Sequence, residues 1–63
     1  MSVVKIVVWQ EKDAWLGYLQ DYPDYWTQGA SEDDLRDHLK DLFQDLTSGA
    51  IPGIRRVEDL VVS

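Results

Sequence analysis

The sequence has no cysteine, a single histidine (His38) and no apolar run that approaches a membrane span. Without cysteine the chain forms neither a disulfide nor a zinc–thiolate site, which is compatible with a reducing compartment. A membrane helix needs about 20 consecutive apolar residues, so we expect no membrane association through a span. The N-terminus also lacks the basic and apolar regions of a signal peptide, so we expect a cytoplasmic protein.

Positive charge is scarce as well: six Lys and Arg residues stand against 12 Asp and Glu residues, for a formal net charge of −6. Nucleic-acid-binding proteins gather basic residues to neutralise phosphates, but the only adjacent basic pair here is Arg55-Arg56. We therefore expect no direct binding to nucleic acid or to an anionic membrane. The same charge suits a basic protein partner, although acidic residues also serve simply to keep a small protein in solution.

Aromatic residues are well represented, with three Trp, three Tyr and one Phe, and 44% of the sequence is hydrophobic. This composition is typical of a folded chain rather than a disordered one. A chain of 63 residues is long enough for one domain only, so we expect a single domain over residues 1–63. No repeat, low-complexity tract or linker divides it.

Two extended segments open the chain. Residues 3–11 are apolar at both alternating sets of positions, which is typical of a central strand covered on both faces. Lys12-Asp13 predicts a tight turn into a second strand over residues 14–20, so the two strands are expected to form an antiparallel hairpin. Gly17 weakens the second strand unless a bulge is needed there or an aromatic side chain or a ligand approaches closely.

A third, shorter strand is predicted over residues 25–28. The segment 21–24 interrupts the strand pattern, because Pro23 cannot donate to a sheet and aspartate favours turns. Gly29 ends the third strand. The first three elements therefore form an antiparallel meander.

A helix is predicted over residues 32–47. Ser31 is a favourable N-cap, and Asp34 gives a carboxylate variant of the capping box. Gly49 suits the position that follows a helix, and Pro52 prevents continuation. One apolar stripe runs along the helix and consists of Leu35, Leu39, Leu42, Phe43 and Leu46.

The segment after the helix favours a short fourth strand at Val61-Val62, returning parallel to an earlier strand. A helical turn over residues 57–60 is the alternative. The expected fold is thus α+β: a three-stranded antiparallel meander with one helix on one face and a short fourth strand, in the order β-β-β-α-β.

One helix can cover only one face of such a sheet. The other face is expected to carry part of the aromatic set Trp9, Trp15, Tyr18, Tyr25 and Trp26. Exposed apolar patches of more than a few hundred Å² usually mark interfaces. We therefore expect the chain to associate with itself as a dimer or larger.

No residue set for catalysis is recognisable. A nucleophile needs an adjacent base and an orienting group, whereas Ser31 has a capping role and Ser48 and Ser63 lie outside the predicted elements. His38 has predicted helix neighbours that are all carboxylates: Asp34, Asp41 and Asp45. It is either a proton donor or pH switch, or a surface histidine in an i,i+4 pair. We expect no enzyme, no catalytic residue and no cofactor.

Aspartates recur every four residues along the predicted helix, at Asp33, Asp37, Asp41 and Asp45. They form a slowly turning stripe opposite the leucines. The stripe is a metal site, a partner surface or a solvated face. Divalent ions need oxygens that converge on one point, whereas a stripe spreads its charges, so we expect no metal site.

An ordered set of short motifs spans residues 4–48: an aromatic-bearing second strand, an Asp-x-Pro turn, a Thr-Gln-Gly step and a capped acidic helix start. The residues that carry them are Asp21, Pro23, Thr27, Gln28, Gly29 and Ser31. In order and spacing the sequence resembles the HicB-like antitoxin family. The resemblance implies a truncated ribonuclease-H-like fold and a partner toxin of the HicA kind, which is small, basic and RNA-cleaving.

The resemblance also implies a mechanism, namely occlusion of the toxin's RNA-binding surface. Only 14 residues follow Gly49, too few for the DNA-binding segment of many members, so a short form that neutralises a toxin is expected. The candidate partner-binding residues are Trp15, Tyr22, Tyr25, Trp26, Asp33, Asp37, Asp41 and Asp45. Two alternatives remain: an acidic oligomeric interaction module without a toxin, and a metal-dependent nuclease on a ribonuclease-H-like sheet.

Overall fold

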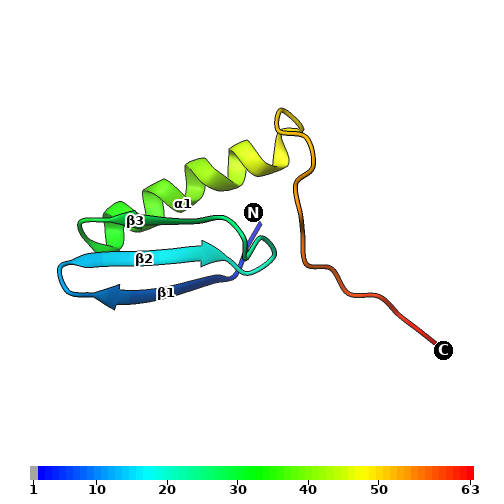
Figure 1. The fold of residues 1–63 in the computed structure, drawn as a ribbon, viewed down its shortest axis with the longest axis horizontal. Helices are drawn as coiled ribbons and strands as arrows, with labels where there is room; N and C mark the ends of the chain where they lie inside the picture. Colours follow the sequence, from blue (N-terminus) through cyan, green and yellow to red (C-terminus); the bar gives the residue numbers. More distant parts are fainter. Residues whose placement is uncertain (1) are drawn as a thin grey trace.

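The computed structural model describes residues 2–63 and begins with a β-hairpin (Figure 1). Strands β1 (Ile6–Glu11) and β2 (Ala14–Leu19) pair antiparallel. Lys12 and Asp13 form the two-residue turn between them, as predicted. Lys12 has a φ of 53°, and the favoured two-residue hairpin turns require a positive φ at the first turn position, because it matches the twist of the strands.

Strand β3 (Trp26–Gly29) pairs antiparallel with β2 and completes a three-stranded sheet in the order β1-β2-β3. The central strand is therefore β2. The expectation that the first strand is central is wrong, because within residues 2–63 β2 is the only strand that pairs with β1. One edge of β1 is left without a neighbouring strand.

Helix α1 (Glu32–Thr47) has the predicted bounds, and its ends explain why. The Asp34 amide donates to Ser31 Oγ at 3.1 Å, and the Ala30 amide donates to Asp34 Oδ2 at 2.9 Å. Two amide groups at the start of the helix thus find side-chain acceptors. Gly49 follows the helix with a φ of 80°, the left-handed conformation that glycine adopts without a steric penalty.

Two glycines let α1 approach the sheet closely. A Cβ atom on Gly17 would lie 2.7 Å from the Val7 carbonyl oxygen and 3.2 Å from Leu35 Cδ2. A Cβ on Gly29 would lie 2.6 Å from the Leu35 amide nitrogen, which belongs to the helix backbone. The close neighbour of Gly17 is therefore the leucine face of α1, rather than an aromatic side chain or a ligand.

The core lies between α1 and the sheet face that it covers. Its buried side chains are Leu19, Tyr22, Leu35, Leu39 and Leu46. Half-buried side chains close its margins: Ile6, Val8, Trp15, Tyr25, Leu42, Phe43 and Ile54. Tyr22 is only 4% exposed although it lies in the segment between β2 and β3, so this turn contributes to the core as well as reversing the chain.

The segment after α1 contains neither the fourth strand predicted at Val61-Val62 nor the alternative helical turn over residues 57–60. The Val57 amide donates to the Asp21 carbonyl at 2.6 Å, beyond the end of β2. From that point the chain leads past the sheet and away from it (Figure 1). A strand needs a neighbouring edge to bond with, and residues 58–63 do not lie along one.

Candidate binding surfaces

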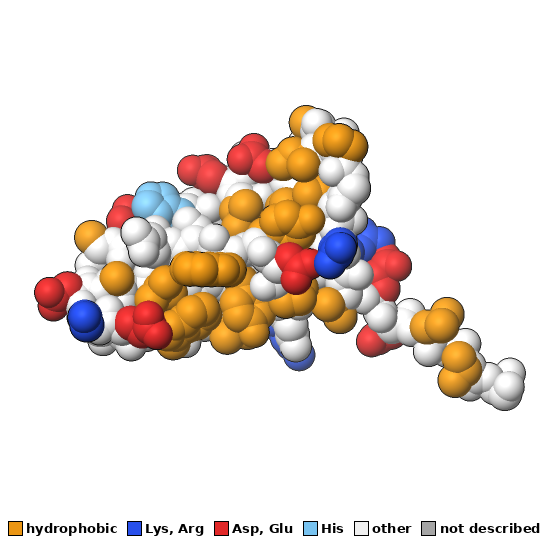
Figure 2. Space-filling model, in the orientation of Figure 1, with side chains coloured by type: hydrophobic (Ala, Val, Ile, Leu, Met, Phe, Trp, Pro, Cys, Tyr) orange, Lys and Arg blue, Asp and Glu red, His pale blue; other side chains and the backbone are white. Residues whose placement is uncertain are grey.

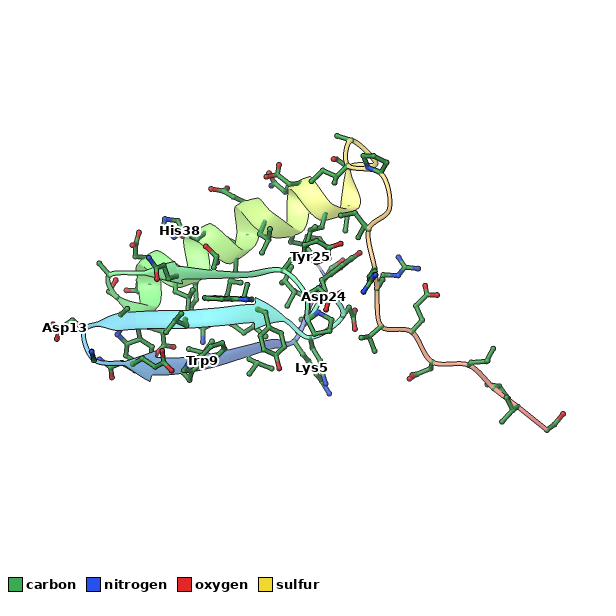
Figure 3. The ribbon with its side chains drawn as sticks, in the orientation of Figure 1. Lys5, Trp9, Asp13, Asp24, Tyr25 and His38 are labelled. Atoms are coloured by element: carbon green, nitrogen blue, oxygen red, sulfur yellow. The ribbon has the colours of Figure 1, made fainter. Side chains whose placement is uncertain are left out.

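The sheet face that α1 leaves uncovered carries an apolar patch, which we call the open sheet face. It consists of Val7, Trp9, Leu16, Tyr18 and Trp26, which the strand register places side by side on one side of the sheet. Successive side chains of a strand point to opposite faces, so these residues point away from the face on which Gly17 meets α1. Figure 2 shows hydrophobic side chains gathered across the strands, and Figure 3 shows Trp9 on β1.

The open sheet face has a small packed centre of its own. The rings of Trp9 and Tyr18 meet edge to face, with 6.0 Å between their centroids. Leu16 pairs with Trp9 and is only 6% exposed although no helix covers it. Trp26 is 60% exposed beside Tyr18. A tryptophan with this much apolar area in water is a candidate anchor for a partner, because buried aromatic side chains dominate interface energetics.

The second surface is the outward face of α1, which we call the acidic stripe. It consists of Asp33, Asp37, Asp41 and Asp45, all of which the structure leaves at least partly in solvent. None of them forms an ion pair with another residue of the described chain, 2–63. Within the same residues, no group of three or more His, Cys, Asp or Glu side chains could hold a metal ion. The stripe lies on the outward face of α1, whereas the open sheet face lies on the side of the sheet that α1 leaves uncovered, so the two surfaces are separate.

The structure distributes the aromatic candidates differently from the prediction. Tyr22 lies in the core, and Trp15 is half-buried against it. Tyr25 is half-buried too, and its hydroxyl accepts a hydrogen bond from the Arg55 amide at 3.2 Å. Of the four aromatic candidates, Trp26 alone is exposed in the described structure.

Two further aromatic residues of the open sheet face, Trp9 and Tyr18, were predicted to belong to the uncovered aromatic set but not to the partner-binding residues. Along β1 and β2 these two residues alternate with residues that face the core. This alternation in the sequence could have identified Trp9 and Tyr18 as binding residues.

His38 lies on α1 (Figure 3), and its ring is hydrogen-bonded to the backbone of β3. Its Nδ1 lies 2.7 Å from the Gln28 carbonyl oxygen, and its Nε2 lies 3.5 Å from Asp34 Oδ1. No serine or threonine hydroxyl among residues 2–63 is hydrogen-bonded to this ring. The arrangement is that of a surface histidine in an i,i+4 pair, with an added bond to the sheet.

Most of the motif residues have structural roles here. Asp21 presents its carbonyl to Val57, and Gln28 presents its carbonyl to His38. Gly29 gives space to α1, and Ser31 caps it. Asp21 and Pro23 lie in the turn between β2 and β3, and Thr27 lies in β3.

Comparison of the chain with protein-family models, with curated proteins and with solved structures gives no match. Among residues 2–63, no helix is both long enough and apolar enough to span a bilayer.

Proposed function

We propose that this chain is a cytoplasmic, non-catalytic protein of the HicB-like antitoxin type. It neutralises a small basic RNA-cleaving toxin of the HicA kind by covering the toxin's RNA-binding surface. The observation that supports this function best is the acidic stripe. It leaves four carboxylates without ion-pair partners among residues 2–63, on a chain with a formal net charge of −6.

The stripe suits competition with RNA. Residues four apart on a helix are separated by about 6 Å along its axis, so the stripe offers a row of negative charges of the kind a nucleic-acid backbone offers. A toxin that cleaves RNA presents lysines and arginines to phosphates, and the same cations can pair with the stripe. Opposite charge accelerates the encounter of the two proteins, and apolar contacts then slow their separation.

The proposal includes a fourth strand in the assembled protein. Beside the three strands that are present, it completes the truncated ribonuclease-H-like sheet that the resemblance implies. The open sheet face supplies the self-association, with Trp26 as its exposed anchor.

The direct test uses the small basic protein encoded by the neighbouring reading frame. Co-expression is expected to restore the growth that this toxin arrests, the two proteins are expected to co-purify, and the chain is expected to inhibit RNA cleavage in vitro. No binding at micromolar concentration contradicts the proposal.

The acidic stripe is tested by the double substitution Asp37→Lys and Asp41→Lys. Association with the toxin is expected to slow at least several-fold at low salt, with a smaller effect on dissociation. The difference should shrink as salt rises, because the Debye length falls from about 30 Å at 0.01 M to about 8 Å at physiological ionic strength. The control is Glu11→Lys with Asp13→Lys, which makes the same charge change at exposed positions of the hairpin. Equal slowing by both pairs assigns the effect to net charge and not to the stripe.

A second candidate function, an acidic self-assembling interaction module without a toxin, is favoured by the open sheet face alone. It predicts self-association without toxin binding. Growth rescue and inhibition of RNA cleavage separate the two functions.

A further inference from the structure

The free edge of β1 presents unused backbone hydrogen-bonding groups. The Gln20 amide donates to the Lys5 carbonyl at 2.9 Å, so the odd-numbered residues of this strand bond to β2. In an antiparallel pair, the residues between them point their N–H and C=O groups the other way, which directs Ile6, Val8 and Gln10 to the free edge. Among residues 2–63, no backbone partner lies along this edge. Such an edge is a template for a further strand.

A groove of about 500 Å³ runs between this edge and α1. Its apolar lining comes from Val4, Ile6, Leu19, Leu39 and Phe43. The groove therefore exposes a margin of the core at the place that a fourth strand would cover.

The chain also carries a segment that matches this groove, which we call the tail (residues 57–62). Four of its six side chains are exposed and apolar: Val57 at 51%, Leu60 at 83%, Val61 at 92% and Val62 at 81%. Figure 1 shows the tail extended and leading away from the rest of the molecule. Because its apolar side chains are exposed to water, this segment is suited to pack against another surface.

We propose that the tail of one copy binds along β1 of a second copy as its fourth strand. In an extended segment alternate side chains face opposite ways, so Leu60 and Val62 enter the groove against α1. Val61 then faces the other way and extends the open sheet face beside Val7. The tail is apolar on both sides, as β1 is, which suits a strand that has the core on one side and an interface on the other.

Charge complementarity supports the same pairing. The groove is flanked by Arg36 and Lys40, whereas the tail carries two anions, Asp59 and Glu58, the second of which forms an ion pair with Arg56. Arg36 is engaged with Glu32 at 3.1 Å, and Lys40 forms no ion pair with another described residue of the chain. Lys40 is thus the cation available to the tail of the second copy.

The second copy is favoured over the chain's own β1 by the contacts that fix the start of the tail. The Val57 amide donates to the Asp21 carbonyl, and the Arg55 amide donates to the Tyr25 hydroxyl. The Arg55 guanidinium also lies 3.8 Å from the Asp24 carboxylate. These contacts hold the chain beside the turn between β2 and β3 and direct residues 58–62 outward. Exchange of such an element between two copies is a low-cost route to a dimer. The exchange uses a surface other than the acidic stripe, so it occurs whether or not a toxin is bound.

The experiment separates donor from acceptor. It uses full-length chains carrying Trp26→Asp, which removes the anchor of the open sheet face, so that tail exchange is the association that remains. This chain is expected to be a dimer at micromolar concentration by analytical ultracentrifugation. Adding Leu60→Asp and Val62→Asp makes a donor-deficient chain, and adding Val8→Pro makes an acceptor-deficient chain, since proline cannot donate from a strand edge.

Each deficient chain alone is expected to dissociate at least tenfold more readily than the Trp26→Asp parent. A mixture of the two is expected to form a heterodimer, because one supplies an intact edge and the other an intact tail. Circular dichroism verifies that each variant is folded. Lys40→Glu provides a second acceptor variant that leaves the strand backbone intact, and Lys12→Glu at the hairpin turn is its matched control.

Amide exchange of Ile6 and Val8 distinguishes the source of the tail. Protection that rises with protein concentration supports exchange between copies. Protection that is independent of concentration in a monomeric chain assigns the tail to its own β1 and overturns the proposal. A Trp26→Asp chain that is monomeric at all concentrations and leaves these amides unprotected also overturns it, as does a donor-deficient chain that dimerises like its parent.

Discussion

Single residues affect the packing of this protein most where the backbone leaves no room for a larger side chain. Gly29 meets the backbone of the first turn of α1, and Gly17 meets both a strand carbonyl and a leucine side chain. A leucine side chain can shift by a few tenths of an ångström, whereas a helix backbone held by its cap at Ser31 cannot do so without moving the element. The two glycines therefore set the distance between helix and sheet.

Gly29→Ala is expected to destabilise the protein by about 2–3 kcal/mol, towards the upper part of the range for overpacking, because the added methyl group meets backbone atoms. Urea unfolding followed by tryptophan fluorescence measures the change. Gln28→Ala, at the exposed neighbouring position, is the control and should change stability by less than about 0.5 kcal/mol. A Gly29→Ala protein as stable as the wild type would show that α1 can move away from β3.

Lys12→Gly is expected to stabilise the hairpin by about 0.5–1 kcal/mol. Lys12 has a φ of 53°, which is costly for a residue with a Cβ, and the gain is partly offset by the greater freedom of glycine in the unfolded chain. Asp13→Gly is the matched control, since Asp13 is not among the residues with positive φ, and it should destabilise. Thermal unfolding of both variants checks the difference in sign.

At the scale of elements, α1 combines a favourable start with an unfavourable end. Acidic residues occupy its first turn, and its last turn has no basic residue. Negative charge is favourable near a helix N-terminus and unfavourable near the C-terminus. The acidic stripe therefore continues into a region where it does not help the helix, which is consistent with a role in binding.

Asp33→Lys and Asp45→Lys are expected to change stability in opposite directions, although both belong to the same stripe. Asp33→Lys should destabilise α1 by about 0.3–1 kcal/mol, and Asp45→Lys should stabilise it by a similar amount. Chemical denaturation at low and high salt measures both effects, which salt should reduce. Changes of the same sign would mean that net charge, and not the helix dipole, controls the response.

At the scale of the whole molecule, one helix on a three-stranded sheet leaves a face and an edge uncovered. Trp26 at 60% exposure marks the face, and the groove beside β1 marks the edge. The tail, in turn, is apolar chain without a surface to cover. These features together support the proposal that the protomer completes its core by assembly.

The wild-type chain is expected to be a dimer or larger at micromolar concentration, by light scattering. If the wild-type assembly is larger than a dimer, Trp26→Asp should lower its mass to that of the tail-exchanged dimer, because a charged side chain does not tolerate burial on the open sheet face. On dilution, tryptophan emission of the wild type should shift to longer wavelength as Trp9 and Trp26 meet water. Val3→Asp, at an exposed valine before β1, is the control for adding one charge. A wild-type monomer at high concentration contradicts the prediction.

The sequence by itself determined those parts of the fold that depend on local chemistry. The helix ends were predicted to the residue, because Ser31, Asp34 and Gly49 specify them through their own hydrogen bonds and backbone angles. The hairpin turn was predicted from the short polar break between two apolar segments, although Lys12 itself does not favour the positive φ that it adopts. The acidic stripe was also readable, since helical spacing alone places its members away from the leucines.

Only the tertiary structure decided the features that depend on the neighbours of a segment. Periodicity shows that β1 is apolar on both sides, but whether a strand is central or at an edge depends on the path of the distant tail. Tyr22 read as part of a turn and is buried, because the chain between β2 and β3 folds over the end of the core. Helix α1 packs against the sheet at Gly17, so the side chains close to this glycine are leucines of α1 and not an aromatic ring. Burial and strand pairing depend on which segments lie next to each other in the fold. A local sequence pattern narrows the possible neighbours of a segment but does not determine which of them it meets.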